Sequence, residues 1–194
     1  MVIEFEGYLY HVVRYEKLNI GQKLHFGGKP NFFSRKINSI DFSVNEKDIN
    51  ALILSKDIDK LTEDESKKLK QYVYHSCLVI RELVLENIRL KEYTNHPSRL
   101  ECLYCVESIE DARKWIEPLK RMDRHNPPLQ IVKLKAKGKL FKGDGNLMLR
   151  NTFSIDSKIE MAHKYWNAET NSDNEELLFI GDVEVVKIFE DLEI

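Results

Sequence analysis

The sequence has little of what builds a secreted or membrane-spanning protein. Only three of its 194 residues are cysteines, and this odd number argues against a disulfide framework and for a reducing compartment. No apolar run approaches the roughly 20 residues that cross a bilayer. The start, MVIEFEGY, is acidic and lacks a basic segment followed by an apolar one, so we expect no signal peptide. These absences predict a cytoplasmic protein that does not bind membranes.

Strong charge of one sign, linkers and internal repeats are also absent. The formal net charge of -2 gives no bulk electrostatic attraction to nucleic acid or to membranes. A content of 42% hydrophobic and 32% charged residues is typical of a folded globular protein. No stretch rich in Pro, Gly or Ser divides the chain, and its length suits one domain. The sequence therefore predicts a single domain over residues 1–194.

Strong catalytic and metal-binding motifs are missing as well. There is no Walker pattern, GxGxxG, GxSxG or HExxH. Cys102 and Cys105 form a CxxC, but they fall in a predicted strand, where residues three apart point to opposite faces. We expect both to pack as small hydrophobic residues. The stretch GDGN (143–146) lacks the spaced carboxylates of a calcium loop and predicts a hairpin turn. No metal is expected.

The elements that the sequence does predict follow a mixed order. The strand YLYHVVR (8–14) leads into a Gly-rich loop and then a helical region at about 44–95. Within that region Thr62 and Glu65 form a capping box, and apolar residues recur at helical spacing to about Tyr93. After it, the sequence predicts a strand at LECLYCVES and then a helix capped by Ser108 and Asp111. A strand at LQIVKLKAKGKLFKG and a helix at SKIEMAHKYWN follow. The last segment, EELLFIGDVEVVKIF, predicts two strands joined by a Gly turn. This order favours an α+β fold with a mixed or antiparallel sheet.

Two features of the strands have more than one interpretation. His11 shares a strand face with Leu9 and Val13, so it is either a core histidine bonded to a backbone carbonyl or a group that contacts a ligand. Lysines alternate along residues 133–139, which fits phosphate contacts to nucleic acid. A solvated face, or an edge strand protected against pairing, explains the same pattern and is favoured by the net acidic chain.

Four segments of the chain resemble the ADP-ribosyltransferase superfamily. They are YLYHVVR, RLECLYCVESIEDARKWIEPL, LQIVKLKAKGKLFKGDGNLM and EELLFIGDVEVVKI. More narrowly, the whole chain resembles an uncharacterised bacterial family of domains of unknown function, family 2441. The resemblance implies a split mixed or antiparallel sheet with a helical insertion after the first strand. It also implies binding of NAD as a substrate, with no metal, in a cleft.

The resemblance assigns roles to individual residues. The family's histidine, tyrosine and glutamate map onto His11, Tyr104 and Glu176. By this resemblance His11 would bind a ribose hydroxyl of NAD, and Tyr104 would stack on the nicotinamide ring. Glu176 would bind the hydroxyl of the nicotinamide ribose, beside the carbon that is attacked. A carboxylate at that place stabilises an oxocarbenium-like transition state. Arg99 or Arg14 would pair with the pyrophosphate.

Two details of this assignment stay open. Where many members have a small residue and then a hydroxyl after the histidine, this chain has Val12 and Val13. The hydroxyl that contacts the ribose is therefore either missing or supplied from elsewhere, for example by Ser34. Glu175 and Glu176 point to opposite faces of a strand, and the register decides between them. The glycine that follows at Gly181 favours Glu176.

Three functions compete on these grounds. The first is an enzyme that transfers ADP-ribose from NAD to a protein or nucleic-acid acceptor, or hydrolyses NAD. The second is an inactive module that binds a nucleotide or a partner protein on the same fold. The third, RNA chemistry of the 2′-phosphotransferase type, would need the lysines of residues 133–139 to face the site.

Overall fold

A computed structural model describes residues 2–38, 53–54, 60–122, 127–149, 154–168 and 175–191 of the chain. Much of the predicted helical region before residue 60 lies outside these ranges. The elements, in chain order, are β1 (Val2–Val13), β2 (Lys23–Phe26), α1 (Phe32–Asn38), α3 (Glu63–Glu92), β3 (Leu103–Cys105), α4 (Ile109–Met122), β4 (Gln130–Asp144), α5 (Gly145–Leu149), α6 (Ile155–Trp166) and β5 (Glu175–Asp191).

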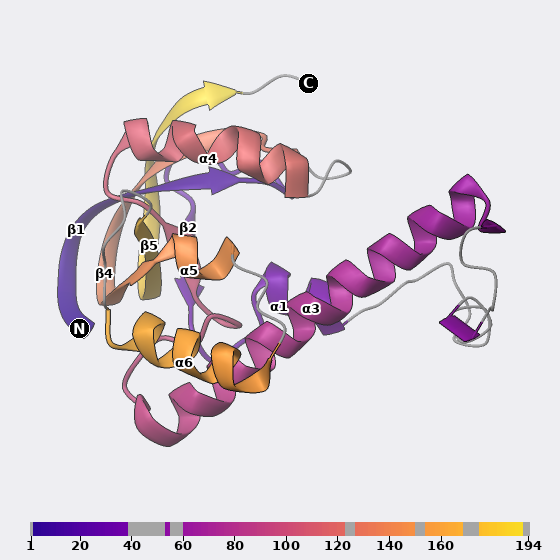
Figure 1. Ribbon diagram of the computed structural model, residues 1–194. Coiled ribbons are helices and arrows are strands. Elements are labelled where there is room, and N and C mark those ends of the chain that lie inside the picture. The colour runs from indigo at the N-terminus through magenta and orange to yellow at the C-terminus, as the bar shows by residue number, and fades with distance from the viewer. Residues whose placement is uncertain are drawn as a thin grey trace.

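The strands form one five-stranded sheet in which every pairing is antiparallel. The order is β1-β4-β5-β2, and the short β3 pairs with β5 beside this path. The long strands curve strongly, with α4 at one end of the sheet and α6 with part of α3 at the other (Figure 1). The α+β prediction is confirmed, with an antiparallel sheet.

Glycines let the two central strands approach closely. Gly138 of β4 lies opposite Gly181 of β5, and a Cβ on either would collide with the backbone of the facing strand. Gly181 also has φ +136°, a conformation that L side chains rarely adopt. The predicted Gly turn in the last segment is therefore wrong: β5 runs unbroken through Gly181 because the glycine serves close strand packing.

The GDGN stretch differs from its prediction too. β4 continues through Gly143 and Asp144, and the short helix α5 begins at Gly145. The Asp144 carboxylate accepts a hydrogen bond from the backbone N–H of Asn146 at 2.8 Å. Such a bond caps the start of a helix, so the stretch joins strand to helix and does not form a hairpin.

The helix starts follow the predicted capping residues. Thr62 and Glu65 make the reciprocal bonds of a capping box at the start of α3. The Ser108 hydroxyl oxygen accepts from the Asp111 backbone N–H at 3.0 Å at the start of α4. Within the described ranges, no helix combines the length and the apolar character needed to cross a bilayer, since the long α3 is rich in charge.

Three apolar clusters hold these elements together. One joins the sheet strands through Leu9, Leu134 and Val185. A second packs Tyr165 and Trp166 of α6 against Leu85 of α3. A third, smaller one lies beneath α4. Cys105 belongs to the first cluster and Cys102 to the second, and both are free and buried. The prediction that both pack as small hydrophobic residues is confirmed, although β3 begins at Leu103, so Cys102 lies just before the strand.

The row of lysines lies on an exposed face of a central strand. Lys135, Lys137 and Lys139 are exposed on β4, which pairs with β1 on one side and β5 on the other. Lys137 forms an ion pair with Glu6 at 3.1 Å. Of the explanations offered for the row, the solvated face is confirmed and the edge strand is wrong, because β4 has a neighbour on each side.

Candidate functional site

A cavity of about 400 Å³ opens between the end of β1, β3, and the helices α1, α3 and α4. This volume lies in the range of small-molecule sites. Much of its wall is aromatic, from residues on both halves of the chain: Tyr10, Tyr15, Phe26, Phe32, Phe33, Tyr74, Tyr104 and Trp115. The polar groups in the wall include one imidazole, three guanidinium groups and one carboxylate, from His11, Arg14, Arg81, Arg99 and Glu176. The site is thus an apolar slot with a few charged and polar groups.

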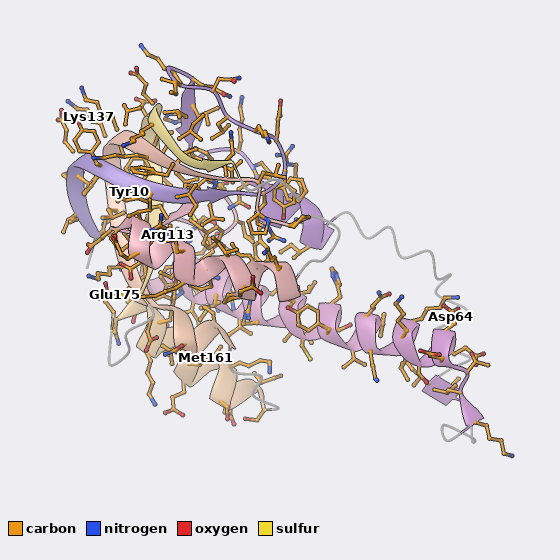
Figure 2. All side chains as sticks on the ribbon, turned by 90° about the horizontal axis from the view of Figure 1, so that it is seen from above. Tyr10, Asp64, Arg113, Lys137, Met161 and Glu175 are labelled. Carbon is orange, nitrogen blue, oxygen red and sulfur yellow. The ribbon has the colours of Figure 1, made fainter. Side chains whose placement is uncertain are left out.

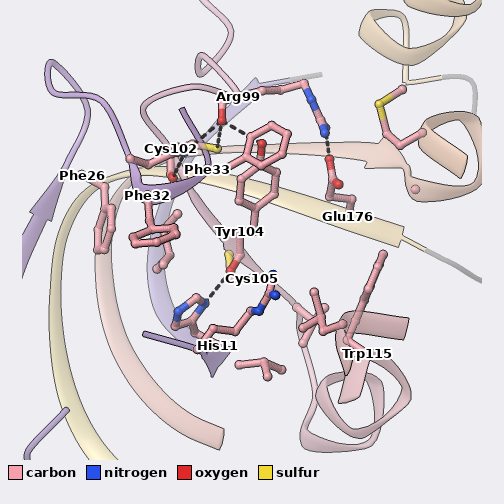
Figure 3. A pocket seen from close by; sticks show the side chains of 18 of the residues that line it. His11, Phe26, Phe32, Phe33, Arg99, Cys102, Tyr104, Cys105, Trp115 and Glu176 are labelled. Carbon is pink, nitrogen blue, oxygen red and sulfur yellow. Dashed lines mark hydrogen bonds and ion pairs between the residues drawn. The ribbon is translucent and has the colours of Figure 1, made fainter. Parts of the chain in front are cut away.

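His11 fits both interpretations of the first strand. Its Nδ1 lies 2.8 Å from the backbone carbonyl oxygen of Tyr104, and its ring lines the cavity (Figure 3). Burial lowers the pKa of His11, although the bond to the Tyr104 carbonyl partly opposes this. The neutral ring must therefore carry its hydrogen on Nδ1, since a carbonyl only accepts. Nε2, which has no partner among the described residues, is left as a hydrogen-bond acceptor.

The Tyr104 side chain is held by contacts of both its hydroxyl and its ring. Its hydroxyl donates to the backbone carbonyl of Arg99 at 2.7 Å, and its ring packs edge to face with Phe33. Burial raises the pKa of the Tyr104 hydroxyl well above its usual value, so it stays protonated. The Arg99 guanidinium lies over the ring, 5.4 Å from its centroid. The aromatic wall at this point is rigid.

Glu176 sits at the start of β5 and is held by one oxygen only. Its Oε1 accepts from Arg99 Nη1, drawn as a dashed line in Figure 3, and from the Tyr165 hydroxyl at 2.7 Å. Its Oε2 has no hydrogen-bond partner among the described residues. Among the described residues that line the cavity, Glu176 is the one carboxylate, and its second oxygen is free to accept a hydrogen bond.

Arg99 joins this carboxylate to the long helix α3. Its Nε donates to Glu82 Oε2 at 2.9 Å, and Glu82 also accepts from Arg81 at 2.8 Å. Burial alone would raise the pKa of the Glu82 carboxyl, but the charges of Arg99 and Arg81 outweigh it and lower the pKa. Arg99 Nη2 has no partner among the described residues, so part of this buried cation stays available in the cavity wall.

The remaining predicted residues divide between the cavity and other places. Arg14 lines the cavity, with its guanidinium 5.3 Å from the centroid of the Tyr15 ring. Ser34 does not line it: this buried residue of α1 accepts at its hydroxyl from Asn38 Nδ2 at 3.3 Å. Glu175 also lies outside the lining and pairs with Lys142 at 2.5 Å.

The register of β5 separates the two neighbouring glutamates. Glu175 faces Asp144 and Glu176 faces Gly143 across the β4–β5 ladder. Because alternate side chains point to opposite faces, only Glu176 reaches the cavity. The structure therefore brings together His11, Arg14, Arg99, Tyr104 and Glu176, and it leaves Ser34 and Glu175 outside.

The residues that position Arg99 and Glu176 were not among those predicted from the sequence. Glu82 and Arg81 lie on α3, about one hundred residues before Glu176, and Tyr165 lies on α6. Glu82 is fully buried, and a buried carboxylate needs cationic partners, but its burial is visible only in the structure. Arg81 is its neighbour in the chain, whereas Arg99 and Tyr165 come from other segments, so no local spacing identifies the set.

A family model described as "Protein of unknown function (DUF2441)" matches residues 9–191 of the chain. No curated protein matches it. The matched range contains all the site residues named above.

Proposed function

The chain belongs to the DUF2441 family, and from the chemistry of its cavity we propose that it binds NAD and cleaves it. On this proposal it has an ADP-ribosyltransferase-like fold and either transfers ADP-ribose to a protein or nucleic-acid acceptor or hydrolyses NAD. The antiparallel five-stranded sheet is compatible with that fold. No metal takes part.

One observation carries the proposal: His11, Tyr104 and Glu176, from three strands, line the same cavity. His11 Nε2 and Glu176 Oε2 are two open acceptors, which suit ribose hydroxyl groups because each hydroxyl has a hydrogen to donate. Arg99 Nη2 and the Arg14 guanidinium supply donors that suit phosphate oxygens. The aromatic wall offers rings for stacking on a flat nicotinamide or adenine group. This set of groups matches the parts of a dinucleotide.

The arrangement also suits the reaction. The bond between the ribose C1 and the nicotinamide nitrogen breaks, and its electron pair leaves with nicotinamide. Positive charge develops on the ribose, and a fixed carboxylate such as Glu176 stabilises that charge more in the transition state than in the substrate. An acceptor oxygen or a water then bonds to C1 and loses a proton. Tyr104 and His11 would position the ribose for this step.

The test is nicotinamide release from NAD by the purified protein, with and without cell lysate as a source of acceptors. Glu176→Gln keeps the shape and removes the charge, so we expect release to fall at least about hundredfold. The matched control is Glu175→Gln, next in the chain but outside the cavity, which should release nicotinamide at the wild-type rate. Equal rates for wild type and Glu176→Gln, or no release in either condition, would contradict the enzyme proposal.

A second candidate is a nucleotide-binding module without catalysis. The ion pair between Arg99 and Glu176 favours it, because the guanidinium neutralises the carboxylate that the reaction would use. In that case NAD binds, as measured by calorimetry, and no nicotinamide appears. RNA chemistry of the 2′-phosphotransferase type has less support, since Lys133, Lys135, Lys137 and Lys139 lie outside the cavity lining.

A further inference from the structure

The long helix α3 extends beyond the rest of the described fold. Its 30 residues make it about 45 Å long, and only its C-terminal part packs on the sheet and α6 (Figure 1). The buried side chains, Glu82, Leu85, Ile88 and Arg89, all come from that part. Figure 2 shows Asp64, in the first turn, far from the side chains of the sheet. Packing against the other described elements is therefore concentrated on the C-terminal part of this helix.

Large apolar side chains lie exposed along the helix face opposite the buried one. Leu83 is 62% exposed, Leu90 58%, Val73 52% and Ile80 46%. At 100° per residue, this face is turned about 180° from Leu85 and its buried neighbours. Exposure of this extent along one stripe marks an interaction surface.

The spacing of the stripe is that of a coiled coil. Positions 73, 80 and 87 are seven residues apart, and so are 69, 76, 83 and 90, three or four residues away from the first set. These two sets are the a and d positions of a heptad repeat that spans more than three heptads. Apolar residues occupy five of the seven positions, namely Leu69, Val73, Ile80, Leu83 and Leu90. Asn87 occupies an a position, where an asparagine fixes register in two-stranded coiled coils.

The flanking charges complement those of an identical, parallel helix. The charged residues at g are Glu65 and Glu86, and those at e are Lys70 and Lys91. In a parallel pair each g residue faces the e residue five positions later in the partner, which joins Glu65 to Lys70 and Glu86 to Lys91. An antiparallel pair would face g with g and e with e, so acidic would meet acidic and basic would meet basic.

We propose that α3 is a dimerisation helix, through which two copies of this chain form a parallel, two-stranded coiled coil. The a and d stripe forms the seam, Asn87 pairs with its counterpart across the two-fold axis, and the two folded bodies lie on the outer sides. This surface is independent of the cavity and of the function proposed for it.

Sedimentation velocity of the full chain, at about 1 to 100 µM, tests the dimer. We expect wild type to sediment as a dimer. Leu83→Glu places two charges in the seam and should raise the dissociation constant at least about tenfold. Because Leu83 is 62% exposed, the variant should keep the circular dichroism of wild type. Gln71→Glu is the matched control, on an exposed position of the same helix outside the seam, and should dimerise as wild type does.

Cysteine cross-linking tests the orientation. In a Cys77→Ala background, Asn87→Cys should form a disulfide-linked dimer on mild oxidation, since a parallel seam brings the two Cβ atoms within bonding range. Gln71→Cys in the same background should not, and Cys102 and Cys105 are buried. A monomeric wild type at the highest concentration, or unchanged dimerisation of Leu83→Glu, would overturn the proposal. A dimer that Asn87→Cys fails to cross-link would overturn the parallel arrangement.

Discussion

At the scale of single residues, the cavity wall has side chains that use one polar atom for structure and leave another without a partner among the described residues. His11 binds a carbonyl through Nδ1 and leaves Nε2. Glu176 binds Arg99 and Tyr165 through Oε1 and leaves Oε2. Groups held in this way lose little conformational freedom when a ligand arrives, so more of the contact energy appears as affinity.

The pKa of His11 gives the first prediction at this scale. Nε2 accepts a hydrogen bond only while the ring is neutral, and burial lowers the pKa below 6.5. Protonation would convert Nε2 into a donor. NAD affinity, measured by calorimetry, should therefore stay constant as the pH falls from 8 to 6.5 and decline only at lower pH.

The His11→Gln variant provides the control for this pH dependence. The glutamine is a neutral polar group, so the variant should bind NAD more weakly than wild type. Because glutamine does not titrate, the variant should lack the decline in NAD affinity that protonation of His11 causes at low pH. A wild-type affinity that already halves near pH 6.5 would mean that His11 titrates at an ordinary pKa and would contradict the assignment.

At the scale of elements, the predictions that succeeded rested on local patterns. The capping box and the helical spacing of α3, and the alternation along β1, depend on residues within a few positions of one another. The predictions that failed concerned glycine. Gly181 and the GDGN stretch were expected to turn the chain. At Gly181 the distant strand β4 leaves no room for a Cβ atom, and at Gly143 the ring of Tyr165, from α6, takes that space. The position of Ser34 also depends on distant segments, so its local sequence did not show that its hydroxyl lies outside the cavity lining.

The glycine crossing of β4 and β5 can be tested by substitution. Gly138→Ala puts a methyl group against the backbone of Ile180, a contact that a flexible side chain cannot relieve. We expect the free energy of unfolding in urea to fall by about 3 kcal/mol or more.

Gly28→Ala separates this steric effect from backbone strain. Gly28 has φ +74° with nothing within 4 Å of an added Cβ, so only the conformational cost of about 1 kcal/mol applies. Equal losses of stability in the two variants would contradict the steric explanation.

At the scale of the whole molecule, the site is assembled from most of the chain. Glu176 near the C-terminus, Arg99 in the middle and His11 near the N-terminus meet in one cavity, and the family match covers residues 9–191. A family resemblance in the sequence predicted these three residues, whereas Glu82 and Tyr165, which bind Arg99, are recognised only in the three-dimensional arrangement. A site of this kind requires the whole described fold.

The single-domain prediction for residues 1–194 can be examined with the two tryptophans. Trp115 belongs to the cluster beneath α4 and Trp166 to the one beside α3. In Trp115→Phe and Trp166→Phe, the remaining tryptophan reports on one end of the sheet. We expect its fluorescence in urea to change at the same midpoint as the far-ultraviolet circular dichroism in each variant. Two midpoints separated beyond experimental error would indicate two folding units.

The first strand also affects how the protein behaves at high concentration. β1 forms one border of the sheet, and among the described residues its outer side is bridged at Tyr10 by Val106. The stretch before that bridge carries two exposed carboxylates, Glu4 and Glu6. A second copy that paired its own β1 there would bring like charges close together, which disfavours edge-to-edge association of the sheet.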